Sequence, residues 1–368
     1  MAFNKAPEYT HGSAVKTAVV LVNLGTPDEA DAPSVRRYLK QFLSDPRVVE
    51  IPRAIWWLIL NGIILPIRAS KSAAKYALIW TKEGSPLKVH TEKQSTMLRG
   101  YLGEQGHAVE VRYAMSYGNP SLPDVLNALQ VEGCDRILIV PAYPQYSATT
   151  TASIFDAVTS HYRTVRNIPE LRFIKHYHDD PAYIAALKES VLTHWQSNGR
   201  GNKLVLSFHG VPKRTLLLGD PYHCECYKTA RLLRTALGLT QDELLVTFQS
   251  RFGKAEWLQP YTAPTLVQLA KDGLERVDIM CPGFTSDCLE TLEEISLEAK
   301  HDFLEAGGKE FHYIPCVNEA PSWVGALATI TARHLQGWPT QQSDADKEAD
   351  SAQNVIAANE ARRLGAPK

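Results

Sequence analysis

The sequence predicts an α/β fold of two similar halves, each a parallel sheet flanked by helices, with an active cleft between them. The chain has 368 residues, and because a single hydrophobic core rarely grows beyond about 250–300 residues, this length indicates two domains. Short apolar runs alternate with amphipathic stretches along the chain. Strands of a parallel sheet are buried on both faces and therefore read as continuous apolar runs, as these do.

The clearest strands and helices follow from this alternation. Strands are expected at residues 18–22, 108–111, 137–140, 204–207, 244–248 and 277–281. Amphipathic helices are expected at 182–196, 227–236 and 263–270. From residue 339 onward the chain is polar and has no aromatic residue, which predicts an appendage with a short exposed helix at 352–364.

A weak internal repeat supports two similar halves. LVNLGTP at 21–27 and LSFHGVP at 206–212 share the frame Leu-x-x-x-Gly-x-Pro, and each ends an apolar run. Further along, Pro141, Tyr143, Thr150 and Ile154 recur at one constant offset as Pro282, Phe284, Thr291 and Ile295. The two motifs lie 116 positions apart in the first half (25 to 141) and 72 in the second (210 to 282), which indicates an insertion of about 44 residues in the first half.

This insertion contains the most apolar stretch, AIWWLILNGIILPI at 54–67. It is too short for a membrane-spanning helix, which needs about 20 apolar residues. One interpretation is a buried helix. The other is an apolar lip, the insertion around residues 51–80, that handles a hydrophobic substrate or touches a membrane surface, because the tryptophans at 56 and 57 are of a type favoured at bilayer interfaces. Its position as an insertion favours the lip.

The expected organisation is an N-terminal extension at 1–16, a first half at 17–168, a second half at 169–338 and a polar tail at 339–368. Thirty-nine basic and 40 acidic residues give a net charge of −1, which argues against nucleic acid as a partner. The N-terminus has no apolar core of a signal peptide, and the six cysteines are sparse. A cytoplasmic enzyme with reduced thiols is expected, with peripheral membrane attachment through the apolar lip as an open alternative.

Two residues at expected strand ends could carry chemistry. Ligands of open parallel sheets bind beyond the carboxyl ends of the strands, and the repeat pairs Leu24 with His209 and Thr149 with Glu290. His209 precedes a glycine, and in isolation its ordinary role would be to cap a turn. Glu290 is expected in the first turn of a helix, where a carboxylate ordinarily stabilises the helix terminus.

With Ser286 or Asp287 as the expected N-cap, Asp287, Glu290 and Glu294 would share one helix face. An imidazole and a carboxylate can together bind a divalent transition metal or accept protons. A site with only two protein ligands leaves coordination positions free for water or substrate, which suits a protein that passes a metal onward. Motifs of dinucleotide, P-loop, nucleophile-elbow and HExxH zinc sites are absent from the sequence.

Taken together, seven segments resemble the ferrochelatase family, most closely its bacterial protohaem-forming type. They are LVNLGTP (21–27), GSPL (84–87), YPQYS (143–147), SFHGVP (207–212), GDPY (219–222), FQSRFG (248–253) and PGFTSDCLETLEE (282–294). The resemblance covers about residues 17–338. It implies two Rossmann-like halves and insertion of Fe²⁺ into protoporphyrin IX, which gives protohaem (haem b) and two protons in the last step of haem biosynthesis, a lyase reaction.

The resemblance also assigns residues. It implies that His209 and Glu290 are catalytic and bind the metal, and that Asp287 and Glu294 form an acidic relay. The porphyrin pocket it implies contains Leu24, Gly25, Pro27, Arg112, Tyr113 and Trp257. Leu24 stands where relatives have Tyr or Met and cannot ligate iron, and Cys288 replaces a histidine of animal enzymes.

No permanently bound cofactor is expected, since Fe²⁺ is a substrate. Animal relatives hold a [2Fe–2S] cluster through a cysteine after YPQYS and three near the C-terminus, but here Ala148 follows that motif and no cysteine follows Cys316. We therefore expect no such cluster, although Cys224-x-Cys226 is a suggestive pair.

The expected partners are protoporphyrin IX and Fe²⁺, and the sequence does not identify an iron donor. We hypothesise that the cleft bends the porphyrin and that the apolar lip, with Ile59, Leu60 and the two tryptophans, buries it. Which of His209 and Glu290 takes protons and which handles iron stays open. So do three alternatives: insertion of cobalt or nickel into a more polar tetrapyrrole, coproporphyrin as substrate, and a non-enzymatic haem carrier.

Overall fold

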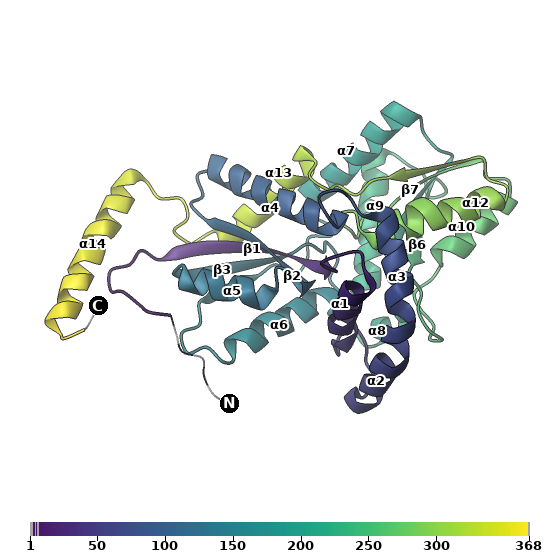
Figure 1. The fold of residues 1–368 in the computed structure, drawn as a ribbon. Coiled ribbons are helices and arrows are strands. Elements are labelled where there is room, and N and C mark those ends of the chain that lie inside the picture. The colour runs from purple at the N-terminus through teal and green to yellow at the C-terminus, as the bar shows by residue number, and fades with distance from the viewer. Residues whose placement is uncertain (1–2, 4, 6, 367–368) are drawn as a thin grey trace.

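The protein contains two four-stranded parallel sheets with the same strand order, β2-β1-β3-β4 and β6-β5-β7-β8. The structure is a computed structural model and describes residues 3, 5 and 7–366. Helices cover both faces of each sheet, and the two sheets follow one another along the molecule (Figure 1). The predicted fold class and the internal repeat are confirmed, because each strand of the first half has its counterpart at the same position in the second.

Most strands are longer than predicted, but β2 begins two residues later than expected and β7 ends one residue earlier. The first sheet consists of β1 (Lys16–Thr26), β2 (Glu110–Gly118), β3 (Cys134–Pro141) and β4 (Glu170–Phe173), and the second of β5 (Lys203–His209), β6 (Leu244–Gln249), β7 (Arg276–Met280) and β8 (Glu310–Ile314). All six predicted strands are present. The edge strands β4 and β8 were missed because they are short, mostly half-buried and carry charged residues, so they lack the continuous apolar pattern.

Helices lie on both sides of the sheets and bury the alternate faces of the strands. In the first half these are α1 (Ala32–Ser44), α4 (Pro86–Glu104), α5 (Leu122–Val131) and α6 (Ser153–Tyr162). Those that follow are α7 (Pro181–Asn198), α8 (Lys213–Leu217), α9 (Tyr222–Leu237), α10 (Thr262–Lys271), α11 (Leu289–Leu292), η3 (Glu294–Ala299), α12 (Lys300–Glu305) and α13 (Pro321–Leu335). The predicted helices correspond to α7, α9 and α10.

One hydrophobic core runs through both halves. It joins Val19 and Leu21 of β1 to Leu206 and Phe208 of β5 through helices that include α13, whose Trp323 is almost fully buried. The helix α13 packs against both α4 and α7. The halves therefore form one packed body.

Two expected boundaries are corrected by the structure. The boundary between 168 and 169 falls before β4, yet β4 belongs to the first sheet. The boundary at 338 also falls too early, because Thr340 is buried and its carbonyl accepts a hydrogen bond from the Ala108 N–H at 2.7 Å. The folded body ends where the backbone stops making hydrogen bonds to it, and amino-acid composition alone does not reveal this position.

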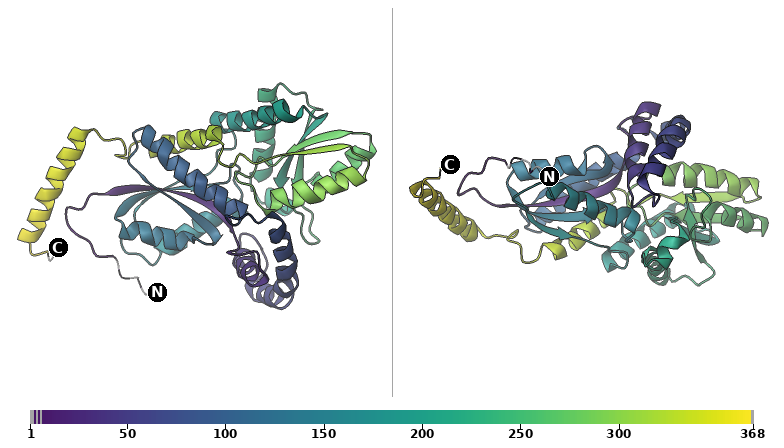
Figure 2. Two further views of the ribbon diagram at one scale, coloured as in Figure 1. Left: turned by 45° about the horizontal axis from the view of Figure 1, so that its top comes forward. Right: turned by 90° about the horizontal axis from the view of Figure 1, so that it is seen from below.

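The last helix, α14 (Asp344–Arg363), is longer than the predicted 352–364 because a capping box between Ser343 and Asp346 starts it earlier. None of its described side chains is buried. The helix stands apart from the sheets, beside the segment that leads into β1 (Figures 1 and 2).

The apolar lip consists of α2 (Arg53–Ile59), η1 (Leu60–Ile64) and α3 (Leu65–Ile79). Trp56 and Leu60 lie inside a small core with Leu43 and Leu65. The opposite face leaves large apolar side chains exposed, namely those of Ile55, Trp57, Leu58, Ile63 and Ile67. One face of this segment is thus buried, as the first interpretation expects, and the role of the exposed face as a lip stays a prediction. Trp56 and Leu60 are buried and cannot contact a porphyrin as expected.

No helix within residues 3, 5 and 7–366 combines the length and apolarity needed to cross a bilayer.

Candidate active site

The imidazole of His209 has one free nitrogen. The residue ends β5, and its Nδ1 lies 2.6 Å from the Gly210 carbonyl oxygen. A carbonyl only accepts hydrogen bonds, so Nδ1 carries the hydrogen, and in the neutral imidazole Nε2 is the nitrogen with the lone pair. A nitrogen in this state can accept a proton or bind a metal.

Two aromatic rings flank this histidine. The ring centroids of Trp257 and Phe284 each lie 6.4 Å from that of His209. A Cβ atom on Gly210 would lie 2.7 Å from the Gln249 carbonyl oxygen and 3.1 Å from the Trp257 ring, so only glycine allows this close approach. Trp257, predicted as a pocket residue, is therefore beside His209.

Glu294 is held next to His209 by Ser250. Its carboxylate accepts hydrogen bonds from the Ser250 N–H at 2.7 Å and the Ser250 hydroxyl at 2.5 Å. Burial raises the pKa of Glu294, while the bonds from Ser250 and the charge of His209 oppose this rise. Glu294 also begins the π-helix η3, an irregularity that is frequent at functional sites.

Glu290 faces the first half of the molecule. It lies in the first turn of α11, as predicted, and its carbonyl accepts a hydrogen bond from the Gln249 amide at 2.7 Å. Burial raises the pKa values of Tyr38, Tyr76 and Tyr143, and the charge of Glu290 raises them further. These phenols come from α1, α3 and the loop after β3, so the charge of Glu290 acts on groups of the first half.

Asp287 is buried in the loop before the helix that carries Glu290. The N-cap of α11 is Cys288, and Asp287 precedes the helix; the expected common helix face is therefore wrong. Its buried carboxylate accepts hydrogen bonds from the side chains of Tyr313, Thr291 and Asn318 and from the Cys316 N–H. These four bonds fix the loop that leads into α11.

The strand ends of the two sheets meet at this junction. The Thr285 hydroxyl after β7 donates to the Ala142 carbonyl after β3 at 3.1 Å. Leu24 near the end of β1 is half-buried, and Pro27 directly after the strand is buried. Gly25 has φ +107°, and a Cβ there would lie 1.7 Å from the Tyr117 carbonyl oxygen. The predicted loop opposite His209 therefore depends on a glycine.

Arg112 and Tyr113 lie elsewhere. Arg112 forms ion pairs with Glu110 at 2.8 Å and Glu132 at 3.1 Å, early in β2. Tyr113 packs against the main core, and burial together with Glu92 raises its pKa to about 12. Because the site forms at the carboxyl ends of the strands, residues at the start of β2 are remote from it, and the expectation that this pair lines the pocket is corrected.

The two suggestive cysteines lie on opposite faces of α9, since Cys224 is exposed and Cys226 is buried. They cannot ligate one ion together without rearrangement. The expectation that no [2Fe–2S] cluster is bound stays a prediction.

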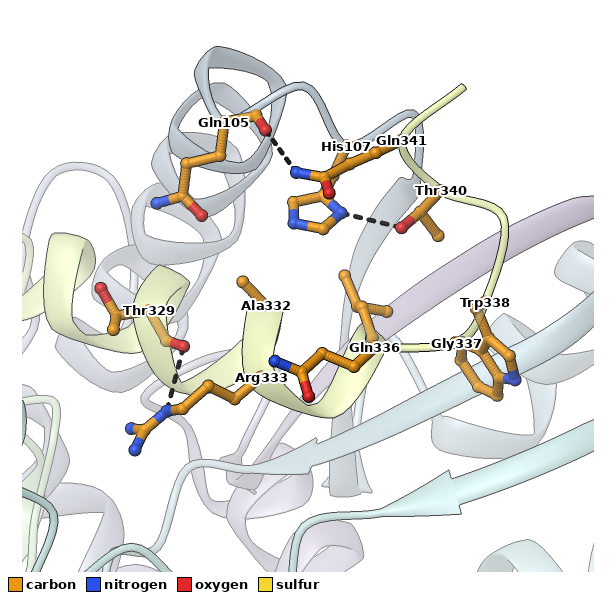
Figure 3. Close-up of a pocket in the computed structure, with 11 residues that line it drawn as sticks. Gln105, His107, Thr329, Ala332, Arg333, Gln336, Gly337, Trp338, Thr340 and Gln341 are labelled. Atoms are coloured by element: carbon orange, nitrogen blue, oxygen red, sulfur yellow. Dashed lines mark hydrogen bonds between the residues drawn. The ribbon is translucent and has the colours of Figure 1, made fainter. Parts of the chain in front are cut away.

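A separate cavity of about 590 Å³ lies between the end of α4, the end of α13 and residues 336–341. Its polar lining includes His107, which contacts the Thr340 hydroxyl at 2.8 Å, and the Gln341 amide, which donates to the Gln105 carbonyl (Figure 3). None of the predicted site residues contributes to this lining.

Ser250 and Phe284 were missed as site residues. Both stand inside segments that carry the resemblance, FQSRFG and PGFTSDCLETLEE. Phe284 also had a direct signal, because the repeat pairs it with Tyr143 at the equivalent strand end.

The fold and this site define an α/β enzyme that handles a divalent metal where two similar parallel sheets meet. A sequence profile of the family described as Ferrochelatase matches residues 16–335. A ferrochelatase of Janthinobacterium sp. (strain Marseille) is 68% identical over 100% of both chains, and one of Herminiimonas arsenicoxydans is 66% identical over 100% of both. The chain belongs to the ferrochelatase family.

Among solved structures, SirB from Bacillus subtilis with Fe³⁺ is similar over 87% of this chain and 95% of its own, with a TM-score of 0.47 and 16% identity.

Proposed function

We propose that this chain, as a ferrochelatase, inserts Fe²⁺ into protoporphyrin IX at His209 and Glu290, giving haem b and two protons. The observation that carries the assignment of the site is the free Nε2 of His209, whose Nδ1 is bonded to the Gly210 carbonyl. The buried carboxyl group of Glu294 lies near enough to His209 for the charges of the two residues to interact.

The reaction needs acceptors for two pyrrole protons as iron takes their place. A neutral imidazole accepts a proton at physiological pH, and a carboxylate accepts one or binds iron. His209 and Glu290 divide these two tasks. Both residues belong to the second half, His209 at the end of β5 and Glu290 in the first turn of α11, and the charges of both act on Glu294.

Glu294 serves as the relay behind this pair. Its raised pKa, caused first by burial, favours a carboxyl group that can hold a proton passed from His209. Asp287 supports the site differently: four hydrogen bonds to its carboxylate hold the loop before α11, which makes it a positioning residue.

Substitution of the two central residues tests this function. His209→Ala should lower iron insertion at least 100-fold, because general base catalysis typically contributes about 10²–10⁴-fold, while porphyrin binding is largely retained. Glu290→Gln should have a comparable effect. Anaerobic conversion of protoporphyrin with Fe²⁺, followed by absorbance, measures both variants, and near-normal turnover in either would reject the role of that residue.

The same assay separates the alternatives. Protoporphyrin and coproporphyrin are compared under identical conditions, and faster conversion of coproporphyrin would overturn the proposed substrate. Cobalt and nickel replace Fe²⁺ in parallel reactions. Tight haem binding without conversion of metal-free porphyrin would indicate a carrier.

The apolar lip is proposed to contact a membrane surface or the incoming porphyrin. Its exposed side chains include Trp57, Leu58 and Ile63, and Leu217 at the end of α8 and the following Leu218 are exposed as well. An ion pair between Arg214 and Glu50 supports the closeness of α8 and the lip. Exposed apolar patches of this kind mark interaction sites on soluble proteins.

Vesicle sedimentation tests the lip. The double substitution Trp57→Ser with Leu58→Ser should lower binding to phospholipid vesicles several-fold and leave the free energy of unfolding unchanged, since both side chains are already exposed. A control substitution of exposed Leu364 to Ser, on the far side of the molecule, should not change binding. Equal vesicle binding by all three proteins would contradict the membrane contact.

A further inference from the structure

Two histidines and a glutamate cluster outside the iron-insertion site. His176 and His178 lie between β4 and α7, and Glu225 lies in the first turn of α9. Their potential ligand atoms all lie within 4.8 Å of one another. His176 Nδ1 is 2.7 Å from one Glu225 carboxylate oxygen, and His178 Nδ1 is 3.2 Å from the other.

Burial makes this cluster unusual. His178 is 5% exposed and Glu225 is 6% exposed. The Nδ1 atom of His178 is buried and has no hydrogen-bond partner, because its approach to Glu225 lacks the required alignment. Burying a polar nitrogen without a partner costs about 1–3 kcal/mol, so a ligand that engages this nitrogen would remove the cost.

We propose that His176, His178 and Glu225 form a second metal site that binds one divalent transition-metal ion. Two imidazoles and one carboxylate suit first-row metals such as Zn²⁺, Co²⁺ or Fe²⁺. With metal–ligand distances of about 2.1 Å, tetrahedral ligands lie roughly 3.4 Å apart, which is close to the present 2.7 Å and 3.2 Å separations. Only small side-chain movements are needed.

The surroundings already position the carboxylate. The Tyr146 N–H donates to Glu225 at 2.7 Å, and the His178 carbonyl accepts from Thr229 of the same helix at 2.7 Å. His176 is 38% exposed, so the remaining coordination positions open to water and the ion can exchange. A bound ion would join the segment between β4 and α7 to α9.

This site is distinct from the iron-insertion site. Within the described part of the chain, no hydrogen bond or ion pair connects the three residues to His209, Glu290 or Glu294. Binding there is therefore expected to survive loss of His209.

Metal titration of the full-length, chelator-treated protein tests the proposal. Equilibrium dialysis against Zn²⁺ counts bound ions, and Co²⁺ absorbance reports imidazole coordination. Wild type and His209→Ala should each bind one equivalent of metal ion at this cluster. His176→Ala and His178→Gln should lack that equivalent. The matched control His301→Ala removes a fully surface-exposed histidine that also pairs with a glutamate, Glu305, at 3.3 Å, and it should keep the equivalent.

Thermal unfolding supplies the second readout. Zn²⁺ at 100 times the dissociation constant should raise the Tm of wild type and His301→Ala but not that of His176→Ala, since only the folded state holds the three ligands together. His176 is partly exposed, so this variant folds even if His178→Gln does not. Equal stoichiometry and equal Tm shifts in wild type and His176→Ala would overturn the proposal and leave the cluster as a hydrogen-bonded contact.

Discussion

The imidazole of His209 is held by a backbone carbonyl, and its charge interacts with the buried carboxyl group of Glu294. The Gly210 carbonyl takes the Nδ1 hydrogen, and Glu294 lies close enough for its pKa to be lowered by the charge of His209. Ser250 completes the arrangement by donating two hydrogen bonds to Glu294. The proton affinity of Glu294 therefore depends on Ser250.

Removing the Ser250 hydroxyl should shift the pH dependence of iron insertion. A hydrogen bond to a charged group contributes about 1.5–3 kcal/mol, and 1.36 kcal/mol corresponds to one pKa unit. In Ser250→Gly the pKa of Glu294 loses one of the interactions that lower it and rises further. The acidic limb of the kcat profile should move to higher pH by about 1 unit, with activity recovered at alkaline pH.

Glycine is the suitable replacement because Ser250 has φ +64°, which glycine adopts without strain. The Tm of the variant should therefore stay near that of wild type. Superimposable pH profiles would show that Glu294 takes no part in proton transfer.

At the scale of elements, the site depends on how closely β1 and β2 approach at their carboxyl ends. Gly25 and Gly118 both have positive φ, and each would place a Cβ within 2.5 Å of a carbonyl oxygen on the other strand. No side chain fits at either position. The strand ends can meet the second half only because these two residues are glycines.

Gly25→Ala should destabilise the protein by roughly 3 kcal/mol or more, since it combines backbone strain with a clash against the Tyr117 carbonyl. Gly100→Ala is the matched control: Gly100 lies inside α4 with no atom within 4 Å of its would-be Cβ. There alanine should stabilise by about 1 kcal/mol. Chemical denaturation measures both, and a Gly25 variant as stable as wild type would refute the close-approach argument.

The burial of each strand explains which elements could be predicted from the sequence. Strands such as β1 and β5 are buried on both faces and were identified from their apolar runs, whereas the half-buried edge strand β4 was not. His209 and Glu290 were found because motif and repeat mark strand ends. Arg112 was wrongly assigned to the pocket because a short motif match does not show at which end of its strand a residue lies.

The tertiary partners were beyond prediction. Ser250 reaches Glu294 across 44 positions of sequence, and the cluster of His176, His178 and Glu225 assembles from segments 49 positions apart. Such contacts leave no periodic or local signal. They appear only once the helices are packed.

At the scale of the whole molecule, ion pairs and apolar contacts join the two halves around the site. Leu289 and Leu292 of α11 pack against a buried cluster that α1 and α3 form, which includes Tyr76. Lys75 of α3 donates to Glu293 at 2.9 Å and to Glu298 at 2.7 Å. The helix that carries Glu290 is thus attached to the first half through α3, and the relative position of the halves sets the geometry of the site.

Lys75→Met should weaken this attachment. Glu293 is almost fully buried, with a side-chain exposure of 6%, whereas Glu298 is 52% exposed. Loss of Lys75 leaves a buried carboxylate unpaired, and because Lys75 itself is 42% exposed we expect a cost of about 1–3 kcal/mol. Glu298→Gln, which removes only the exposed partner, should cost less than about 0.5 kcal/mol.

The pH dependence of this loss identifies its cause. Burial raises the pKa of Glu293, and Lys75 opposes the rise; in Lys75→Met the pKa therefore rises further. A carboxyl group with a raised folded-state pKa stabilises the fold while it is protonated and loses that contribution as the pH increases. The deficit of Lys75→Met relative to wild type should be largest at neutral pH and shrink as the pH falls through the pKa of Glu293. Urea denaturation at a series of pH values measures it, and a deficit independent of pH would mean that lost packing of the lysine chain, rather than the unpaired charge, holds the halves together.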